Sequence, residues 1–159
     1  AEVSDVFNAV REGASATMLS GESAAGDYPA ESVTYMAKID MKAEESVDYE
    51  VFADGFFFGE SNEDAMAQAA VKMVLNHEIN AIVAEGKDIA KALSKFHPAV
   101  PVIAIVEDAQ EARSLAINFA VHPVLSQEAA EAKIAEAGLN AGDFILVVNQ
   151  DEVKLVEIA

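Results

Sequence analysis

The first forty residues show a helical pattern, a short apolar run and a second helical pattern. The apolar positions of residues 2–11 recur at helical spacing: Val3, Val6, Phe7 and Val10. Gly13 ends this predicted helix, and the run SATMLS at residues 15–20 predicts a buried strand. A second helix is expected from Pro29, since proline suits the first helical turn. Its partly apolar face carries Val33, Met36, Ala37 and Asp40. Helix, strand, helix is typical of a repeating parallel α/β structure.

From residue 61 onward, helical and strand patterns alternate clearly. Ser61 and Asp64 predict a capping box for a helix whose apolar face carries Met66, Ala69, Met73 and Val74. The elements expected after it are a strand at 81–84, a helix at 87–96, a strand at 100–106, a helix at 109–119, a strand at 122–125, a helix at 128–137 and strands at 143–148 and 152–158. The polar turn NQDE makes the last two strands an antiparallel hairpin. Continuous apolar strands imply helices on both sheet faces, so we predict an α/β fold, a three-layer α/β/α domain with a mostly parallel sheet and a closing antiparallel hairpin.

The pattern weakens between these two regions, which indicates a boundary. We expect a first unit at residues 1–42, a linker at 43–60 and a complete carboxy-terminal α/β domain at 61–159. One strand and two helices cannot close a core, so the first unit is predicted to be incomplete. The run FFF at residues 56–58 cannot bury all three rings on one face, so one or two rings are expected to anchor the linker.

Charge narrows the classes of partner. The 159 residues hold 28 acidic and 10 basic side chains, a formal charge of −18, which would repel nucleic acid phosphates and anionic lipid. We therefore expect no nucleic acid and no membrane partner. No apolar run approaches the roughly 20 residues that span a bilayer, and the first ten residues resemble no signal peptide, so a cytoplasmic location is expected. The excess of acidic side chains fits either a high-salt environment or an ordinary solvated surface. The sequence contains no cysteine, which excludes disulfides and thiolate chemistry.

Two stretches of the sequence resemble a known protein family. Residues 1–39, AEVSDVFNAVREGASATMLSGESAAGDYPAESVTYMAKI, closely resemble the last helix, strand and helix of the barrel in the pyruvate kinase family. That family reads AEVSDVANAV followed by GxDAxMLSGETAxGxYPxEAV. Residues 94–125, SKFHPAVPVIAIVEDAQEARSLAINFAVHPVL, and residues 138–148, GLNAGDFILVV, resemble the family's carboxy-terminal domain. The chain thus resembles the carboxy-terminal third of a pyruvate kinase, with a remnant of a (β/α)8 barrel before the α/β domain.

The resemblance implies an activity for the parent protein. Pyruvate kinases transfer a phosphoryl group from phosphoenolpyruvate to ADP, giving pyruvate and ATP in glycolysis, with Mg²⁺ and K⁺ neutralising the phosphate. The family's catalytic side chains lie on earlier barrel strands, so we expect this segment to be inactive, with no catalytic residue or metal ligand of its own. Ser20 and Glu22 stand in the family's SGE motif at the barrel mouth. They are candidates for the active-site rim, although a strand-ending turn that satisfies backbone donors is the simpler interpretation. The family's homotetramer implies that the carboxy-terminal domain serves in subunit assembly and coupling.

The family's effector turn, TxSGxTA, is the second candidate site, and it has changed here. The aligned residues are Ala84, Glu85, Gly86, Lys87, Asp88, Ile89 and Ala90. Three hydroxyl donors to a sugar phosphate are gone, at roughly 1.5–3 kcal/mol each, and about 4 kcal/mol is near a thousandfold in affinity. The turn NQDE replaces the family's glycine-rich effector loop, and a helix-sized deletion follows HPVLSQ. We expect no sugar-phosphate activation at the usual place. The alternative is a relocated anion site on Gly86 and the helix amides.

The remaining sequence features do not indicate a further functional site. His77, His97 and His122 are far apart in sequence, so a metal or catalytic cluster is not expected. EGKD lacks the spacing of a nucleotide-binding P-loop. A stand-alone, non-catalytic domain that binds a small molecule or a protein is the alternative to a kinase segment, but such a module would have no use for residues 1–39.

Overall fold

The computed structural model describes residues 2–54 and 61–159. The chain divides into two compact units, Ala1–Asp48 and Tyr49–Ala159, and each is described by itself. The predicted run FFF at residues 56–58 lies outside the described residues. In the described part of the chain, no helix is long and apolar enough to cross a membrane.

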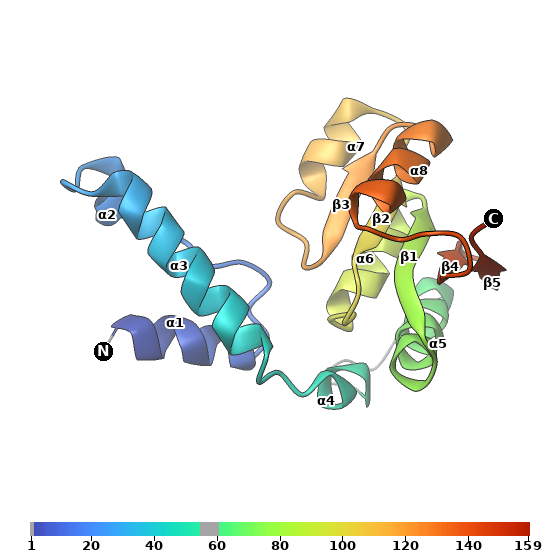
Figure 1. The fold of residues 1–159 in the computed structure, drawn as a ribbon, viewed down its shortest axis with the longest axis horizontal. Helices are drawn as coiled ribbons and strands as arrows, with labels where there is room; N and C mark the ends of the chain where they lie inside the picture. The colour runs from blue at the N-terminus through green and yellow to red at the C-terminus, as the bar shows by residue number, and fades with distance from the viewer. Residues whose placement is uncertain (1, 55–60) are drawn as a thin grey trace. The chain divides into compact units, whose positions relative to one another are not determined.

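The first unit consists of helices. These are α1 (Glu2–Arg11), α2 (Gly21–Ala24) and α3 (Pro29–Glu44), with α1 packed against α3 (Figure 1). Gly13 ends α1 as predicted: its φ is 90°, its N–H donates to Val10 O at 3.0 Å, and the N–H of Ala14 donates to Ala9 O at 3.0 Å. This pair of bonds is the Schellman motif, which satisfies carbonyls that the helix end leaves open.

The strand predicted at residues 15–20 is wrong for the described chain. These residues form an irregular connection that belongs to no sheet. A strand requires a neighbour for its ladder of hydrogen bonds, and the described residues of this unit offer none. The segment is tied to α3 instead, because the Thr17 hydroxyl donates to Asp40 Oδ2 at 2.8 Å.

The second unit alternates helices and strands. Its elements are α4 (Tyr49–Asp54), α5 (Asn62–Asn76), β1 (Ile79–Glu85), α6 (Lys87–Lys95), β2 (Val102–Ile105), α7 (Ala109–Ser114), β3 (Val121–Val124), α8 (Gln127–Glu136), β4 (Phe144–Val148) and β5 (Val153–Glu157). The Ser61 half of the predicted capping box is confirmed, since the Ser61 side chain accepts from the N–H of Asp64 at 3.1 Å. The Asp64 carboxylate itself pairs with Lys95 Nζ at 2.7 Å.

One five-stranded sheet runs through this unit in the order β3-β2-β1-β4-β5 (Figure 1). The pairs β1–β2, β1–β4 and β2–β3 are parallel, and β4–β5 is the antiparallel hairpin. The strand order reverses between β1 and β4, which makes this a doubly wound sheet. The predicted fold class is therefore confirmed.

Apolar side chains cover both faces of the sheet. On one face, α5 and α6 bury Val71, Leu93 and Phe96 against Ile82 and Leu146. On the other face, α8 buries Ala130 and Ile134 against alternate strand residues: Ala81, Val83, Ile103 and Ile145. Opposite burial of successive residues is what a strand covered on both sides requires.

Two predicted segments differ from the structure. The helix expected at residues 109–119 ends at Ser114, because shorter turn bonds follow: Leu115 N–H to Ala112 O and Asn118 N–H to Leu115 O. Of residues 43–60, expected to form a linker, residues 43–44 complete α3 and residues 49–54 form α4. Phe52 and Ala53 on α4 are buried, so this part of the segment packs as core.

Candidate functional site

The serine-glycine-glutamate turn folds back on its own backbone. Ser20 is the residue before α2, and its N–H donates to Glu22 Oε2 at 2.9 Å. Hydrogen bonds from the backbone N–H groups of Glu22 itself and of Ser20 hold the pKa of Glu22 below its ordinary value. Both side chains are exposed, and the Ser20 hydroxyl makes no capping bond. The Glu22 carboxylate thus accepts hydrogen bonds from the backbone of its own turn.

Gly26 is a residue of this turn that the sequence reasoning did not single out. A Cβ built on Gly26 would lie 2.5 Å from the carbonyl oxygen of Glu22, closer than any ordinary contact. The glycine therefore permits the close backbone approach that shapes the turn. Its place four residues after Glu22, between two helices, is the signal that could have marked it.

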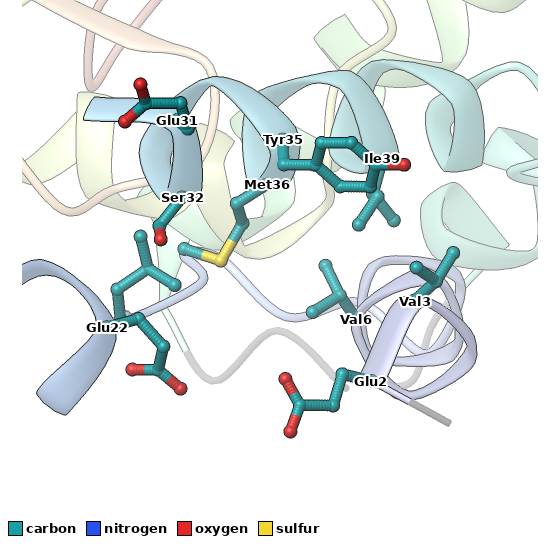
Figure 2. Close-up of a pocket in the computed structure, with 10 residues that line it drawn as sticks. Glu2, Val3, Val6, Glu22, Glu31, Ser32, Tyr35, Met36 and Ile39 are labelled. Carbon is teal, nitrogen blue, oxygen red and sulfur yellow. The ribbon is translucent and has the colours of Figure 1, made fainter. Parts of the chain in front are cut away.

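A cavity of about 330 Å³ lies between α1, α3 and this turn. Figure 2 shows Met36 from α3 and Val6 from α1 directed toward it, with Glu22 beside them. Its lining is Glu2, Val3, Val6, Leu19, Glu22, Glu31, Ser32, Tyr35, Met36 and Ile39. Three of these side chains are carboxylates and none is basic, so this cavity is unsuited to a phosphate.

The effector-like turn joins β1 to α6 in the second unit. Gly86 precedes α6 with φ 114° and ψ 155°, and its N–H donates to Ile105 O at 3.0 Å. Ala84 and Ile89 are buried in the core, and their side chains carry no polar group for a ligand. The side chain of Glu85 accepts from Asn149 Nδ2 at 3.0 Å. Of the predicted site residues, the ones that reach solvent are Glu85, Gly86, Lys87 and Asp88.

Lys87 is held by a carboxylate of a neighbouring element. Its Nζ lies 2.8 Å from Glu111 Oε1 on α7, and Glu111 Oε2 accepts the N–H of Glu107 at 3.2 Å. The hydrogen bond and charge of Glu111 raise the pKa of Lys87 above its ordinary value. In return, Lys87 and then the N–H of Glu107 lower the pKa of Glu111. The turn's one cationic side chain is therefore neutralised within the protein.

The cavity at this turn is strongly acidic. It has a volume of about 220 Å³ and is lined by Glu63, Glu85, Gly86, Lys87, Asp88, Ile89, Glu107, Glu111 and Gln150. Five carboxylates face one lysine, which disfavours an anion. The backbone N–H groups of Glu111 and Gln110 bond to Asp108 and lower its pKa, so the start of α7 is also capped by negative charge.

Three lining residues were not identified from the sequence: Glu63, Glu107 and Glu111. Gln150 belongs to the turn NQDE, which the sequence placed at the effector loop. The position of residues in the chain could have indicated the site. Residues that directly follow parallel strands meet at one edge of the sheet, next to the point where the strand order reverses.

Metal ions are not accommodated by the side chains seen here. Within residues 2–54 and 61–159, no three His, Asp or Glu side chains come together in a way that could hold an ion. The described side chains therefore offer no fitting site for the Mg²⁺ and K⁺ that the resemblance implies. His97 lies in an aromatic stack with Phe52 and Phe119.

The fold places the chain in a class of proteins: a helical unit is followed by a doubly wound α/β domain with a loop site at the carboxyl edge of its sheet. Residues 1–33 match the pyruvate kinase barrel domain, and residues 64–155 match the pyruvate kinase alpha/beta domain. The chain therefore belongs to the pyruvate kinase family, with the end of the barrel domain followed by the α/β domain.

Individual relatives agree. The chain is 35% identical over 161 residues to a pyruvate kinase of Clostridium acetobutylicum, which covers 92% of this chain and 34% of that protein. It is 42% identical over 127 residues to a pyruvate kinase of Clostridium perfringens, covering 76% of this chain and 27% of that one. A crystal structure of Cryptosporidium parvum pyruvate kinase matches with a TM-score of 0.87 and 27% identity, over 98% of this chain and 35% of that chain. The chain spans about a third of the length of such relatives.

Proposed function

We propose that this chain is part of a pyruvate kinase that has lost sugar-phosphate activation at the effector turn. The parent would transfer the phosphoryl group of phosphoenolpyruvate to ADP with Mg²⁺ and K⁺, as a cytoplasmic homotetramer. The α/β domain would serve assembly and coupling between subunits. The family match and the fold support the parent's activity, which would depend on barrel strands of the kind that relatives carry ahead of this region.

The observation that carries the loss of activation is the Lys87–Glu111 pair. A phosphate at this turn needs donors, and the hydroxyl positions are occupied by Ala84, Gly86 and Ile89. The surviving cation is bound by Glu111 at 2.8 Å, and four further carboxylates surround it. A phosphate would have to break this pair and enter a negative field, which opposes the helix-terminus attraction.

Calorimetric titration of the chain with fructose 1,6-bisphosphate tests this proposal. We expect no binding in the micromolar range. Micromolar binding that disappears in Lys87→Ala would overturn it, and so would binding that persists in Lys87→Ala, because the helix amides would then form the relocated anion site.

The segment's inactivity is tested separately. Pyruvate formation from phosphoenolpyruvate and ADP, with Mg²⁺ and K⁺ present, should stay at the uncatalysed rate with this chain. Turnover proportional to its concentration would contradict the placement of the catalytic groups outside residues 1–159.

A further inference from the structure

Three aromatic rings form a continuous stack within the second unit. The ring centroids of Phe52 and His97 lie 4.8 Å apart at 25°, and those of His97 and Phe119 lie 4.5 Å apart at 28°. Phe52 is on α4, His97 follows α6, and Phe119 precedes β3. His97 is 7% exposed, so the middle ring is buried between its neighbours. The stack therefore joins three elements that are distant in sequence, each ring pair adding to simple burial of apolar area.

Two further contacts hold α4 on the same unit. Gln68 Nε2 donates to Ala53 O at 2.9 Å, and Lys72 Nζ lies 2.7 Å from Asp54 Oδ1. Both partners are on α5, and Ala53 is 1% exposed. A helix of six residues is unstable alone, so these tertiary contacts are what maintain it.

The backbone is strained where the stack is built. Among the described residues, the non-glycine residues with positive φ are His97 at 45° and Ala120 at 60°, the latter next to Phe119. Such conformations cost energy and persist only where surrounding contacts fix them. His97 carries the middle ring of the stack, and Ala120 directly follows Phe119, which carries the third ring. The strained backbone at both residues indicates that the surrounding structure fixes the stack.

The segment that precedes α4 is bonded to the end of α3. Residues 45–48 continue from α3, with Ser46 N–H and hydroxyl both bonded to Ala43 O, at 2.9 and 2.7 Å. The division between the two units falls directly after Asp48. Thus α3 ends on one unit and α4 begins on the other within a few residues.

We propose that the Phe52–His97–Phe119 stack clamps α4 onto the second unit, so that the joint between the units is confined to residues 45–48. The helix is then a rigid extension of the α/β domain. A change in the loops that carry His97 or Phe119 would reach the joint through α4. This inference does not depend on the proposed enzymatic function, because every contact that carries it lies within residues 43–120.

Limited proteolysis with a glutamate-specific protease locates the joint in the unaltered chain. Glu45 and Glu50 are both exposed and offer the same cleavage chemistry on either side of Asp48. We expect cleavage after Glu45 to be at least about tenfold faster than after Glu50, since cleavage follows local opening. Equal rates at the two sites would overturn the proposal without any substitution.

Variants then test the stack itself. Phe52→Ala and His97→Ala should raise cleavage after Glu50 about tenfold or more, while His97→Phe, which keeps three rings, should stay near the unaltered rate. Val51→Ala is the matched control, because Val51 is on the same helix and is 48% exposed. Amide hydrogen exchange of β1 and β4 reports whether the sheet is still folded. If His97→Ala leaves Glu50 protected, or if Val51→Ala exposes it equally, the clamp is refuted.

Discussion

Gly86 adopts a backbone conformation that glycine alone populates readily, with φ 114° and ψ 155°. A Cβ at this position would meet nothing within 4 Å, so any penalty for a side chain comes from the backbone. Gly138 also has positive φ, 81°, and open space, but it ends α8 in a Schellman motif, a position that asparagine tolerates.

The same substitution at both glycines should therefore separate the two backbones. Gly86→Asn is expected to lower the free energy of unfolding by about 1–3 kcal/mol, and Gly138→Asn by less than about 1 kcal/mol. Urea unfolding followed by circular dichroism measures both. Equal losses would contradict the special status of the effector-like turn.

Glu111 gives a prediction that depends on pH. Lys87 and the N–H of Glu107 lower its pKa below the ordinary 4.5, so the pair's stabilisation is present above about that pH and is lost as the pH falls through the lowered value. Lys87→Met should raise the pKa of Glu111 toward its ordinary range, although the N–H of Glu107 still lowers it.

Carboxyl carbon NMR titration measures this shift. Lys91→Met is the matched control, because Lys91 is exposed on the same helix, whereas the ion pair to Glu111 is made by Lys87. An unchanged Glu111 titration in Lys87→Met would show that Lys87 does not neutralise it in solution, and the barrier to phosphate would be weaker than proposed.

At the scale of elements, α5 begins with an N-cap whose contribution to the free energy of unfolding can be measured. The Ser61 hydroxyl accepts from the N–H of Asp64 at 3.1 Å, which satisfies one of the open donors of the first turn. Ser61→Ala should destabilise the second unit by about 1 kcal/mol, whereas Ser61→Asp keeps an acceptor and should lose little. Thermal unfolding of the two variants decides this, and a loss in Ser61→Asp as large as in Ser61→Ala would contradict the capping role.

Local signals explain which elements the sequence could predict. Helix caps, the glycine after α1 and the short turn between β4 and β5 act through neighbouring residues, so their effects are visible in the chain. The strand expected at residues 15–20 is apolar enough, but pairing depends on a neighbour that the described chain does not place there. The burial of α4 likewise depends on His97, far along the sequence, which no local pattern reveals.

The candidate effector site was predictable only in part for the same reason. Its turn follows a strand and starts a helix, which the sequence shows directly. Glu63, Glu107 and Gln150 reach it from other elements, so their part depends on the order of strands in the sheet. The loss of hydroxyls was therefore visible beforehand, whereas the capture of Lys87 by Glu111 required the fold.

At the scale of the whole molecule, 28 acidic side chains against 10 basic ones make self-repulsion a general cost of folding. Raising KCl from about 0.1 M to about 1 M shortens the screening length from roughly 10 Å to roughly 3 Å, which weakens this repulsion. At pH 7 the thermal unfolding midpoint should therefore rise with KCl, by about 2–4 °C for each 1 kcal/mol gained.

Acidic pH supplies the control, because the net charge approaches zero near the sequence pI of about 4.3 and the salt effect should shrink there. Ion pairs act in the opposite direction: screening weakens Lys87–Glu111 and Lys95–Asp64, which lie at 2.8 and 2.7 Å. Partly exposed pairs contribute about 1 kcal/mol or less each, so the repulsion of 18 excess negative charges should dominate. A midpoint that falls with KCl at pH 7 would mean that these pairs outweigh the net charge, and that the acidic surface is not under electrostatic strain.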